Sequence, residues 1–562
     1  MGNFKKTKLK PHLIFLLALY LNLFVFNLTF GQNQEKYSEL VKEAWALYEA
    51  KEYLKSGQKY REAFTFLEWK GIVINDLYNA ACSWALANEI DSAFFYLNTI
   101  VPKGHYTNYV HLTQDSDLNS LHKYPQWNEM IEGIKTSIKE KAAKELLAAK
   151  RILDDDAGKL WGVTIWDDHI LVLSFDNMAY SLTPFEGSSI NENNIYAVSL
   201  PENKLSYSSS IQEYDGKRYA IIRDDHLSDH SATIIHELFH LLHEKQKLLN
   251  GNAINYMDNY DAREWLRLEY QALRNCLNSI NHNKDKKTIS DYLQDAMVYR
   301  KIRQTKYSTF LEMETEIETL EGMANYTGFV LSTYPNKYER AIEEINQREY
   351  SNTYIRAFSY ATGFAYGIIF DYLEIDWKQG LHTVYDFLDI YEKKYLKETL
   401  NVTRQREVEA NERNNYAIIH KEETERKEIN EKKIKLLRQQ LIESPTLSVT
   451  LPISNFMQTY DMYGTVVIDS LNVVYTTLFN GTDISQGENF GSFTFFSQKQ
   501  NLEITGILVT RSERVAILIF PLPFRIEGAK IIGDTYEIIL NDNWVVERKN
   551  EKGDFEIIIN YR

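Results

Sequence analysis

The pentapeptide His-Glu-Leu-Phe-His at residues 236–240 constrains the fold of this chain more than any other feature of its sequence. Apolar residues recur around it with helical spacing, which predicts a helix with one buried side. Two histidines four positions apart lie one above the other on the same helix face, so His236 and His240 can bind one zinc ion. Glu237 lies one position further round, within reach of a water molecule on that metal. The motif therefore predicts a helix that is buried on its apolar side and can bind zinc through two histidines.

The residues next to this helix predict how it begins and what precedes it. Asp229 and Ser231 stand just before it as candidate caps, with the acidic side chain near the positive helix end. Residues 218–222 predict a strand, and we expect its edge to be free to pair with a peptide substrate. His243 lies about 10 Å along the helix axis from His236, too far to bind the same metal ion. We expect the His243 side chain to lie next to the metal ligands or at the protein surface.

The motif at residues 236–240 is the HExxH arrangement of zinc metallopeptidases. A catalytic zinc site takes three protein ligands and keeps one open position. The segment 321–326, Glu-Gly-Met-Ala-Asn-Tyr, offers Glu321 as the third ligand. Together with the histidine motif it resembles the gluzincin metallopeptidases, in which a glutamate on a second helix completes the site. The resemblance implies a zinc site formed by His236, His240 and Glu321.

Two other carboxylates compete with Glu321 for this place. Glu318 shares its helix face one turn earlier, and Glu269 precedes an alanine by three residues at a chain distance nearer to that of many short gluzincins. The Gly-x-Ala context favours Glu321, and the small residues Gly322 and Ala324 would let this segment approach the zinc helix closely. Glu269 stays open as the alternative third ligand.

A tyrosine further along the chain extends the resemblance. Tyr360 stands three residues before Gly363, as in the gluzincin aminopeptidases related to leukotriene A4 hydrolase, where such a tyrosine supplies a hydroxyl to the reacting carbonyl. The resemblance implies a catalytic role for Tyr360. Arg356 and Gly367 fall on the same predicted helix face. The Gly-x-Met-Glu-Asn segment of those aminopeptidases is absent before His236, which leaves endopeptidase and exopeptidase action both open.

The N-terminus predicts export from the cytoplasm. Lysines precede an apolar run at residues 13–30, followed by Gly31, which together predict a signal peptide over residues 1–31. If this segment stays uncleaved it anchors the chain in a membrane. The net charge of -15 argues against nucleic-acid binding, because a phosphate backbone favours a basic surface. Cys82 and Cys276 are too few for a disulfide framework.

The pattern along the chain predicts a multidomain α+β protein. Trp-Ala-Leu at residues 45–47 recurs at residues 84–86, and the helix pairs around these segments resemble tetratricopeptide repeats, which bind protein partners. Strands are predicted at 163–166, 170–175 and 195–200, and a charged helix with one apolar side follows the catalytic part. The predicted segments are a signal peptide (1–31), a tetratricopeptide-like helical domain (32–150), a β-rich subdomain (151–230), a mainly helical zincin-like catalytic subdomain (231–396), a charged helical connector (397–445) and an antiparallel β-sandwich-like domain (446–562).

Together these patterns favour a secreted or periplasmic zinc peptidase that hydrolyses peptide bonds through a metal-activated water, with Glu237 as general base. Its partners would be a peptide or protein substrate and a protein bound by the helical repeats. The alternative is a non-catalytic extracytoplasmic scaffold that binds partners through its repeats and sandwich and carries a degenerate zincin site. About one zinc ion per purified chain would support the peptidase, and a chain without zinc would support the scaffold.

Overall fold

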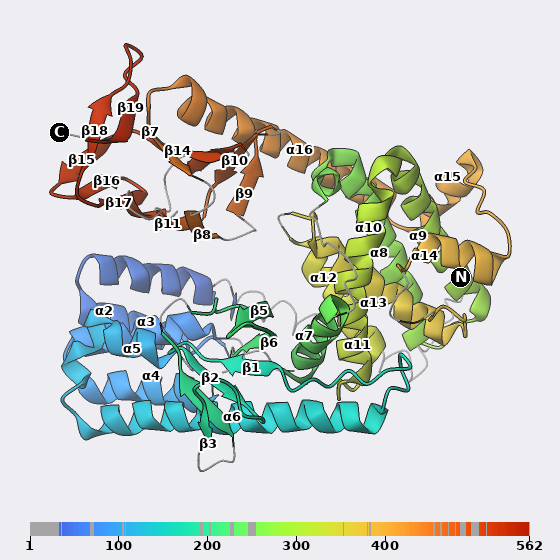
Figure 1. Ribbon diagram of the computed structural model, residues 1–562, viewed down its shortest axis with the longest axis horizontal. Coiled ribbons are helices and arrows are strands. Elements are labelled where there is room, and N and C mark those ends of the chain that lie inside the picture. The colour runs from blue at the N-terminus through green and yellow to red at the C-terminus, as the bar shows by residue number, and fades with distance from the viewer. Residues whose placement is uncertain are drawn as a thin grey trace, which may run out of the picture. The chain divides into compact units, whose positions relative to one another are not determined.

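Figure 1 shows the computed structural model of the chain. It describes residues 33–34, 36–67, 72–103, 106, 108–190, 195–201, 204–224, 230–245, 254–351, 353–378, 380, 384–452, 456–460, 464–469, 471–477, 479–483, 490–495, 505–512 and 514–560. The predicted signal peptide lies outside these residues. The chain forms two compact units, Met1–Leu248 with Thr327–Tyr334 and Leu249–Tyr326 with Pro335–Arg562. Helices and several sheets give the mixed α+β architecture expected from the sequence.

The first unit begins with a series of helices. Their bounds are α2 (Tyr53–Ala63), α3 (Ile74–Leu86), α4 (Ile90–Lys103), α5 (Tyr109–Gln114), η2 (Ser116–Leu121) and the long α6 (Pro125–Asp156). Trp84 of α3 is buried over Gly57 of α2, where an added Cβ would lie 2.6 Å from the indole. Its counterpart in the repeat, Trp45, is 37% exposed. The two copies of the sequence repeat therefore occupy different environments.

A six-stranded sheet follows, with the strand order β3-β4-β2-β1-β6-β5. Its strands are β1 (Ile170–Leu173), β2 (Met178–Ser181), β3 (Ser189–Ile190), β4 (Tyr196–Ser199), β5 (Ser210–Tyr214) and β6 (Lys217–Arg223). Residues 163–166, predicted as a strand, pair with no strand of the described chain. The prediction that residues 218–222 offer a free edge is also wrong, because β6 pairs with β1 on one side and β5 on the other.

The helix that carries residues 236–240 is α7 (His230–Lys245), which packs on β6 and α6. Its apolar side is fully buried at Ile234, Ile235, Leu238 and Leu241, as amphipathic spacing predicts. Ser231 lies inside the helix rather than before it, and Asp229 falls outside the described residues.

A second helix, α11 (Met323–Leu331), runs close against α7. A Cβ added to Gly328 of α11 would lie 2.5 Å from the carbonyl oxygen of Ala232 in α7. The indole of Trp161, which packs against Phe239 of α7, also donates a hydrogen bond to Thr327 of α11. Because any Cβ at position 328 would collide with α7, only glycine permits the close approach of α11 to α7.

Helices dominate the first part of the second unit. Their bounds are η3 (Asn255–Asp258), α8 (Tyr260–Asn281), α9 (Lys286–Lys306), η4 (Ser308–Phe310), α10 (Leu311–Ile317), the π-helical turn η5 (Glu318–Gly322), α12 (Lys337–Glu349), α13 (Ala357–Tyr372), α14 (Phe387–Ile390), η6 (Tyr391–Leu396), α15 (Arg404–Arg413), α16 (Tyr416–Arg438) and η7 (Gln439–Glu443). Because α10 runs directly through η5 into α11, one continuous helical segment carries residues 311–331.

The charged connector forms α16, but its apolar residues do not share one side as predicted. Ile419 is 4% exposed, whereas its neighbour Ile418 is 58% exposed, because adjacent helical residues point in different directions. Charged contacts hold α16 to α8 instead: Glu423 of α16 accepts hydrogen bonds from Arg263 and Arg267 of α8.

Two sheets enclose the core of the C-terminal residues. One has the order β18-β19-β7-β14-β13-β10-β9 and the other the order β15-β16-β17-β12-β11-β8. Their bounds are β7 (Thr446–Pro452), β8 (Phe456–Tyr460), β9 (Thr465–Val467), β10 (Asn472–Tyr475), β11 (Phe479–Asp483), β12 (Gly491–Phe495), β13 (Ile507–Arg511), β14 (Val515–Pro521), β15 (Phe524–Glu527), β16 (Lys530–Gly533), β17 (Tyr536–Leu540), β18 (Trp544–Arg548) and β19 (Phe555–Ile559).

Buried residues of both sheets form one apolar cluster, which includes Leu518, Phe493 and Ile538. The predicted antiparallel pairing holds for every described pair of these strands except β7 with β19, which is parallel. Among the described residues, no helix is both long and apolar enough to cross a bilayer.

Candidate metal centre

Helix α7 presents two histidines from one face. The Nε2 atoms of His236 and His240 lie 2.9 Å apart, and His236 is 9% exposed. This spacing follows from the helix, which places residues four apart one above the other. Glu237, the next residue, is also buried at 6% exposure. The helix therefore places two imidazoles and a carboxylate in a largely buried site.

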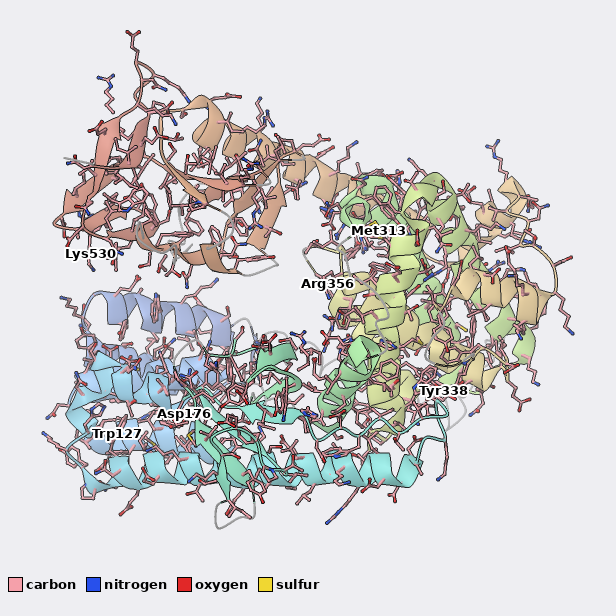
Figure 2. All side chains as sticks on the ribbon, viewed as in Figure 1. Trp127, Asp176, Met313, Tyr338, Arg356 and Lys530 are labelled. Atoms are coloured by element: carbon pink, nitrogen blue, oxygen red, sulfur yellow. The ribbon has the colours of Figure 1, made fainter. Side chains whose placement is uncertain are left out.

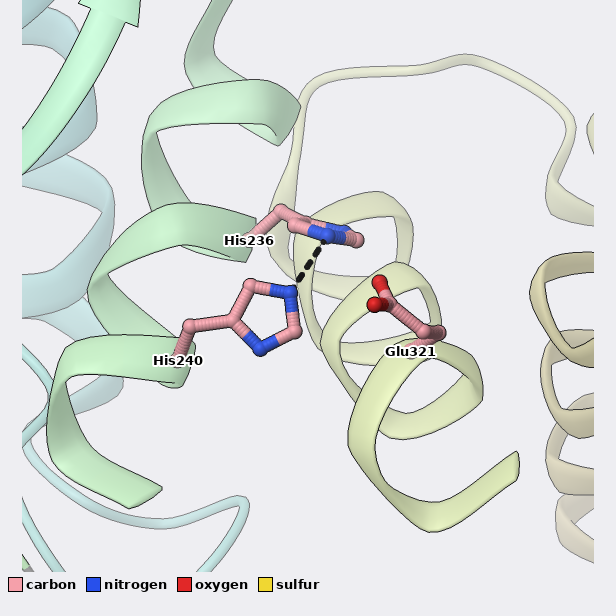
Figure 3. A group of neighbouring side chains, drawn as sticks. All are labelled: His236, His240 and Glu321. Carbon is pink, nitrogen blue, oxygen red and sulfur yellow. Dashed lines mark hydrogen bonds between the residues drawn. The ribbon is translucent and has the colours of Figure 1, made fainter. Parts of the chain in front are cut away.

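Glu321 is the third predicted ligand, and the structure brings it to the histidines. Ligand atoms of His236, His240 and Glu321 all lie within 4.8 Å of one another. Figure 3 shows the Glu321 carboxylate directed toward the two imidazoles. Glu321 stands in the π-helical turn η5, seven residues before Gly328, where α11 meets α7.

Two further side chains contact the Glu321 carboxylate. The guanidinium of Arg356 (Figure 2) donates a hydrogen bond to its Oε1 atom. Burial lowers the pKa of Arg356, but the charges of Glu321 and Tyr360 and the hydrogen bonds to both residues together outweigh burial, so this pKa lies above its usual value. Burial, the negative charge of Glu321 and a hydrogen bond to it raise the pKa of Tyr360 well above its usual value, which keeps the phenol protonated. Arg348 stacks on the Tyr360 ring at 4.5 Å.

The glycines of this region hold α13 against η5. A Cβ added to Gly322 would lie 2.8 Å from the Cα atom of Gly363 in α13. The prediction that Gly322 allows contact with the zinc helix is therefore wrong, since its tight neighbour is α13, and Gly328 makes the close approach to α7. The Asn325 amide donates a 3.1 Å hydrogen bond to the Tyr360 carbonyl and holds the same helix.

The two rival carboxylates are engaged elsewhere. Glu269 accepts hydrogen bonds from Arg300, Arg303 and Tyr366, so both of its oxygens are bonded. Glu318 pairs with the Arg300 guanidinium through both of its own oxygens. Both carboxylates are fully buried. These contacts explain why neither belongs to the group that contains the two histidines.

His243 lies neither at the surface nor among the candidate ligands. It is 2% exposed, and its ring packs against Phe239 with the centroids 4.5 Å apart. Burial, and then the nearby His240, lower the pKa of His243 to about 4. The imidazole is therefore neutral at physiological pH, and its place belongs to the apolar side of α7.

A second group with metal-ligand chemistry contains Cys82, Asp115 and Asp117. Tyr78 donates a hydrogen bond to Asp115, and Tyr48 donates one to Asp117. Burial raises the pKa of the Cys82 thiol far above its usual value, so the thiolate that would bind a metal is disfavoured. We treat this group as a structural hydrogen-bond network.

Sequence patterns did not reveal two features that position Glu321. One is the π-helical turn η5, a local form that is rare and often occurs at functional sites, although η6 and η7 are π-helical here too. The other is the hydrogen bond from Arg356 to Glu321, two residues that lie too far apart along the chain to give a periodic signal. A glycine inside an apolar helix, as at Gly328, is a sequence signal that could have pointed to the close packing of α11 on α7.

Comparison of the chain with protein-family models, with curated proteins and with solved structures finds no match.

Proposed function

We propose that this chain is an extracytoplasmic zinc-dependent peptidase in which His236, His240 and Glu321 hold the metal and Glu237 is the general base. The observation that carries the proposal is the convergence of two imidazole nitrogens and a carboxylate oxygen within 4.8 Å. Two histidines and a glutamate are the ligand set of several catalytic zinc sites, which keep one coordination position open for water or substrate.

The donor atoms fit a zinc ion. Zinc binds imidazole nitrogen and carboxylate oxygen at about 2.0–2.2 Å, so tetrahedral donors lie roughly 3.3 Å apart. The separation of 2.9 Å between the histidine Nε2 atoms is close to this value. With neutral imidazoles and one carboxylate, the bound site would keep a formal charge of about +1, which suits activation of water.

The residues around the donor atoms supply the remaining chemistry. Zinc, when bound, would lower the pKa of a water molecule to about 7 and polarise the scissile carbonyl. Glu237, buried and adjacent to His236, would accept the proton of that water and deliver it to the leaving amine. Tyr360 stays protonated and would donate its hydroxyl hydrogen to the developing oxyanion. Arg356 would orient Glu321 through its hydrogen bond.

The same proposal covers the rest of the chain. The residues of 32–150 would form a tetratricopeptide-like domain that binds a protein partner, and those of 446–562 a β-sandwich-like domain. Residues 1–31 would direct the chain out of the cytoplasm as a signal peptide. The substrate would be a peptide or a protein.

A conservative change at Glu237 tests the assignment. The Glu237→Gln chain should keep its zinc, measured by elemental analysis, and lose about 10²–10⁴-fold in peptide hydrolysis, which is the usual contribution of a general base. Glu244→Gln, an exposed change on the same helix, serves as the matched control and should hydrolyse a peptide library at the wild-type rate. A Glu237→Gln chain with zinc and full activity would refute the role of Glu237, and a wild-type chain without zinc would favour the scaffold hypothesis.

A further inference from the structure

Tyr360, the proposed donor to the oxyanion, lies against helix α12 as well as against Glu321. Helix α12 packs on α13, the helix that carries Tyr360. A tyrosine side chain rotates about two single bonds, so its hydroxyl stays at one point only if neighbouring groups hold the ring. The contacts between α12 and this ring therefore influence where the hydroxyl lies.

The guanidinium of Arg348, a residue of α12, covers one face of the Tyr360 ring. Its central carbon lies 4.5 Å from the ring centroid, which is inside the distance of about 6 Å at which an aromatic face attracts a cation. The Arg348 side chain is 23% exposed, so water weakens this attraction less than it would at an open surface. The stack thus holds the ring from the side of α12.

A buried carboxylate fixes the Arg348 guanidinium in turn. The Nε and Nη2 atoms of Arg348 both contact Oε1 of Glu344, at 2.7 Å and 2.6 Å. Glu344 is 2% exposed, and its other oxygen accepts a 2.8 Å hydrogen bond from Arg340. These three residues stand four positions apart on α12, which places them on one face of the helix. Because two of its nitrogen atoms are held, the guanidinium plane has little freedom to rotate away from the ring.

The remaining contacts of Tyr360 act on its backbone and its hydroxyl. Asn325 donates a hydrogen bond to its carbonyl, and Glu321 and Arg356 interact with its hydroxyl. In the proposed mechanism Glu321 binds zinc and the hydroxyl turns to the oxyanion, so the bond between these two groups is given up during the reaction. The stack with Arg348 involves the ring face and can persist through this change.

We propose that Arg348, held by Glu344, is a positioning residue that keeps the Tyr360 ring where its hydroxyl can meet the developing oxyanion. This inference rests on the proposed function. Arg348 would act through Tyr360 and would not touch the substrate. Its loss should therefore slow the chemical step and leave substrate binding unchanged, since the bond from the hydroxyl forms in the transition state.

Steady-state kinetics of the full-length chain test this role through a double-mutant cycle. Arg348→Leu should lower kcat for peptide hydrolysis by about tenfold with KM unchanged within about twofold, because a partly buried cation–aromatic contact is lost. Tyr360→Phe keeps the ring and removes the hydroxyl. In that background Arg348→Leu should change kcat by less than about twofold, because the group through which Arg348 acts is gone.

Two further variants control for folding and for local packing. Arg348→Lys keeps a cation beside the buried Glu344 but lacks the planar guanidinium, so it tests the stack in a folded chain even if Arg348→Leu fails to fold. It should lower kcat by about threefold, again with no further loss in the Tyr360→Phe background. Gln347→Leu changes the neighbouring exposed residue and should leave kcat and KM at their wild-type values.

Fluorine NMR gives a readout that needs neither substrate nor activity. With Tyr360→fluorotyrosine installed in the full-length chain, the fluorine resonance reports the surroundings of this one ring. The resonance should shift when Arg348→Leu is added, because the ring loses the cation on its face. It should keep its position when Gln347→Leu is added.

Equal losses of kcat from Arg348→Leu with and without the Tyr360 hydroxyl would overturn the proposal, because a purely structural brace acts in both backgrounds. An unshifted fluorine resonance in Arg348→Leu would overturn it as well. Failure of this inference alone leaves the wild-type hydrolysis rate intact. A wild-type chain that binds zinc but hydrolyses no peptide would instead refute the proposed function, and the positioning role with it.

Discussion

Replacing Glu318 by glutamine is expected to remove a large part of the pH dependence of stability. Glu318 lies in a fully buried cluster in which Glu269, Glu314 and Glu318 face two cations among the described residues, Arg300 and Arg303. One negative charge is thus left over in a fully buried cluster. Burial and the charge of Glu314 raise the pKa of Glu318 to about 7, against the attraction of Arg300.

The magnitude follows from proton linkage. The usual pKa of Glu318 is 4.5 and its pKa in the folded state is about 7. Between these two pH values the folded state keeps a proton that the unfolded state releases. This stabilisation is fully present below the unfolded pKa and is lost as the pH rises through the folded pKa. Between about pH 5 and pH 8.5 the loss amounts to roughly 2.5 kcal/mol. The neutral amide of Glu318→Gln does not ionise and avoids this loss.

Differential scanning calorimetry at these two pH values is the assay. Relative to wild type, Glu318→Gln should raise the unfolding temperature at about pH 8.5 by roughly 2–4 °C more than at about pH 5. Glu312→Gln, an exposed change on α10, is the control and should show no such difference. If Glu318→Gln follows the wild-type pH profile, the excess negative charge of the cluster is not where the structure locates it.

Three further predictions concern packing and catalysis. Gly322→Ala should lower stability by about 1–3 kcal/mol and weaken zinc binding, because its Cβ meets backbone atoms of α13 at 2.8 Å, whereas Gly133→Ala meets nothing within 4 Å and should be neutral or stabilising in thermal unfolding. Tyr360→Phe should keep its zinc and lower kcat by about 10²-fold in steady-state kinetics; an unchanged kcat would remove the hydroxyl from the mechanism. Ile419→Asp should cost about 3 kcal/mol or more in thermal unfolding, since it buries a charge, while Ile418→Asp at an exposed position should change stability by less than about 0.5 kcal/mol.

Local patterns in the sequence predicted the parts of the site that depend on local structure. The helix of residues 230–245 follows from apolar spacing, and the common face of His236 and His240 follows from helical geometry. Strands such as β1, β4 and β6 were recognised from short apolar runs because their composition suits a pleated sheet. The mixed α+β architecture could be predicted for the same reason.

The errors concern what each element packs against, which depends on residues far away in the sequence. Residues 218–222 looked like an edge strand because their pairing with β5 and β1 leaves no mark in their own sequence. The sequence context favours Glu321 but does not exclude Glu269, and the distinction comes from Arg300 and Arg303, which occupy both oxygens of Glu269. The sequence predicts close packing at Gly322, but the residue that it packs against is Gly363 of α13, 41 residues further along the chain.

The measurement that tests the central claim most directly is the zinc affinity of the wild-type chain and of Glu321→Gln, with Glu316→Gln as the control on α10. The wild-type and control chains should each bind about one zinc ion, and Glu321→Gln should bind it at least about a hundredfold more weakly while remaining folded by circular dichroism. Wild-type affinity in a folded Glu321→Gln chain would contradict the account, because the two imidazoles would then hold the metal without the carboxylate that lies within 4.8 Å of them.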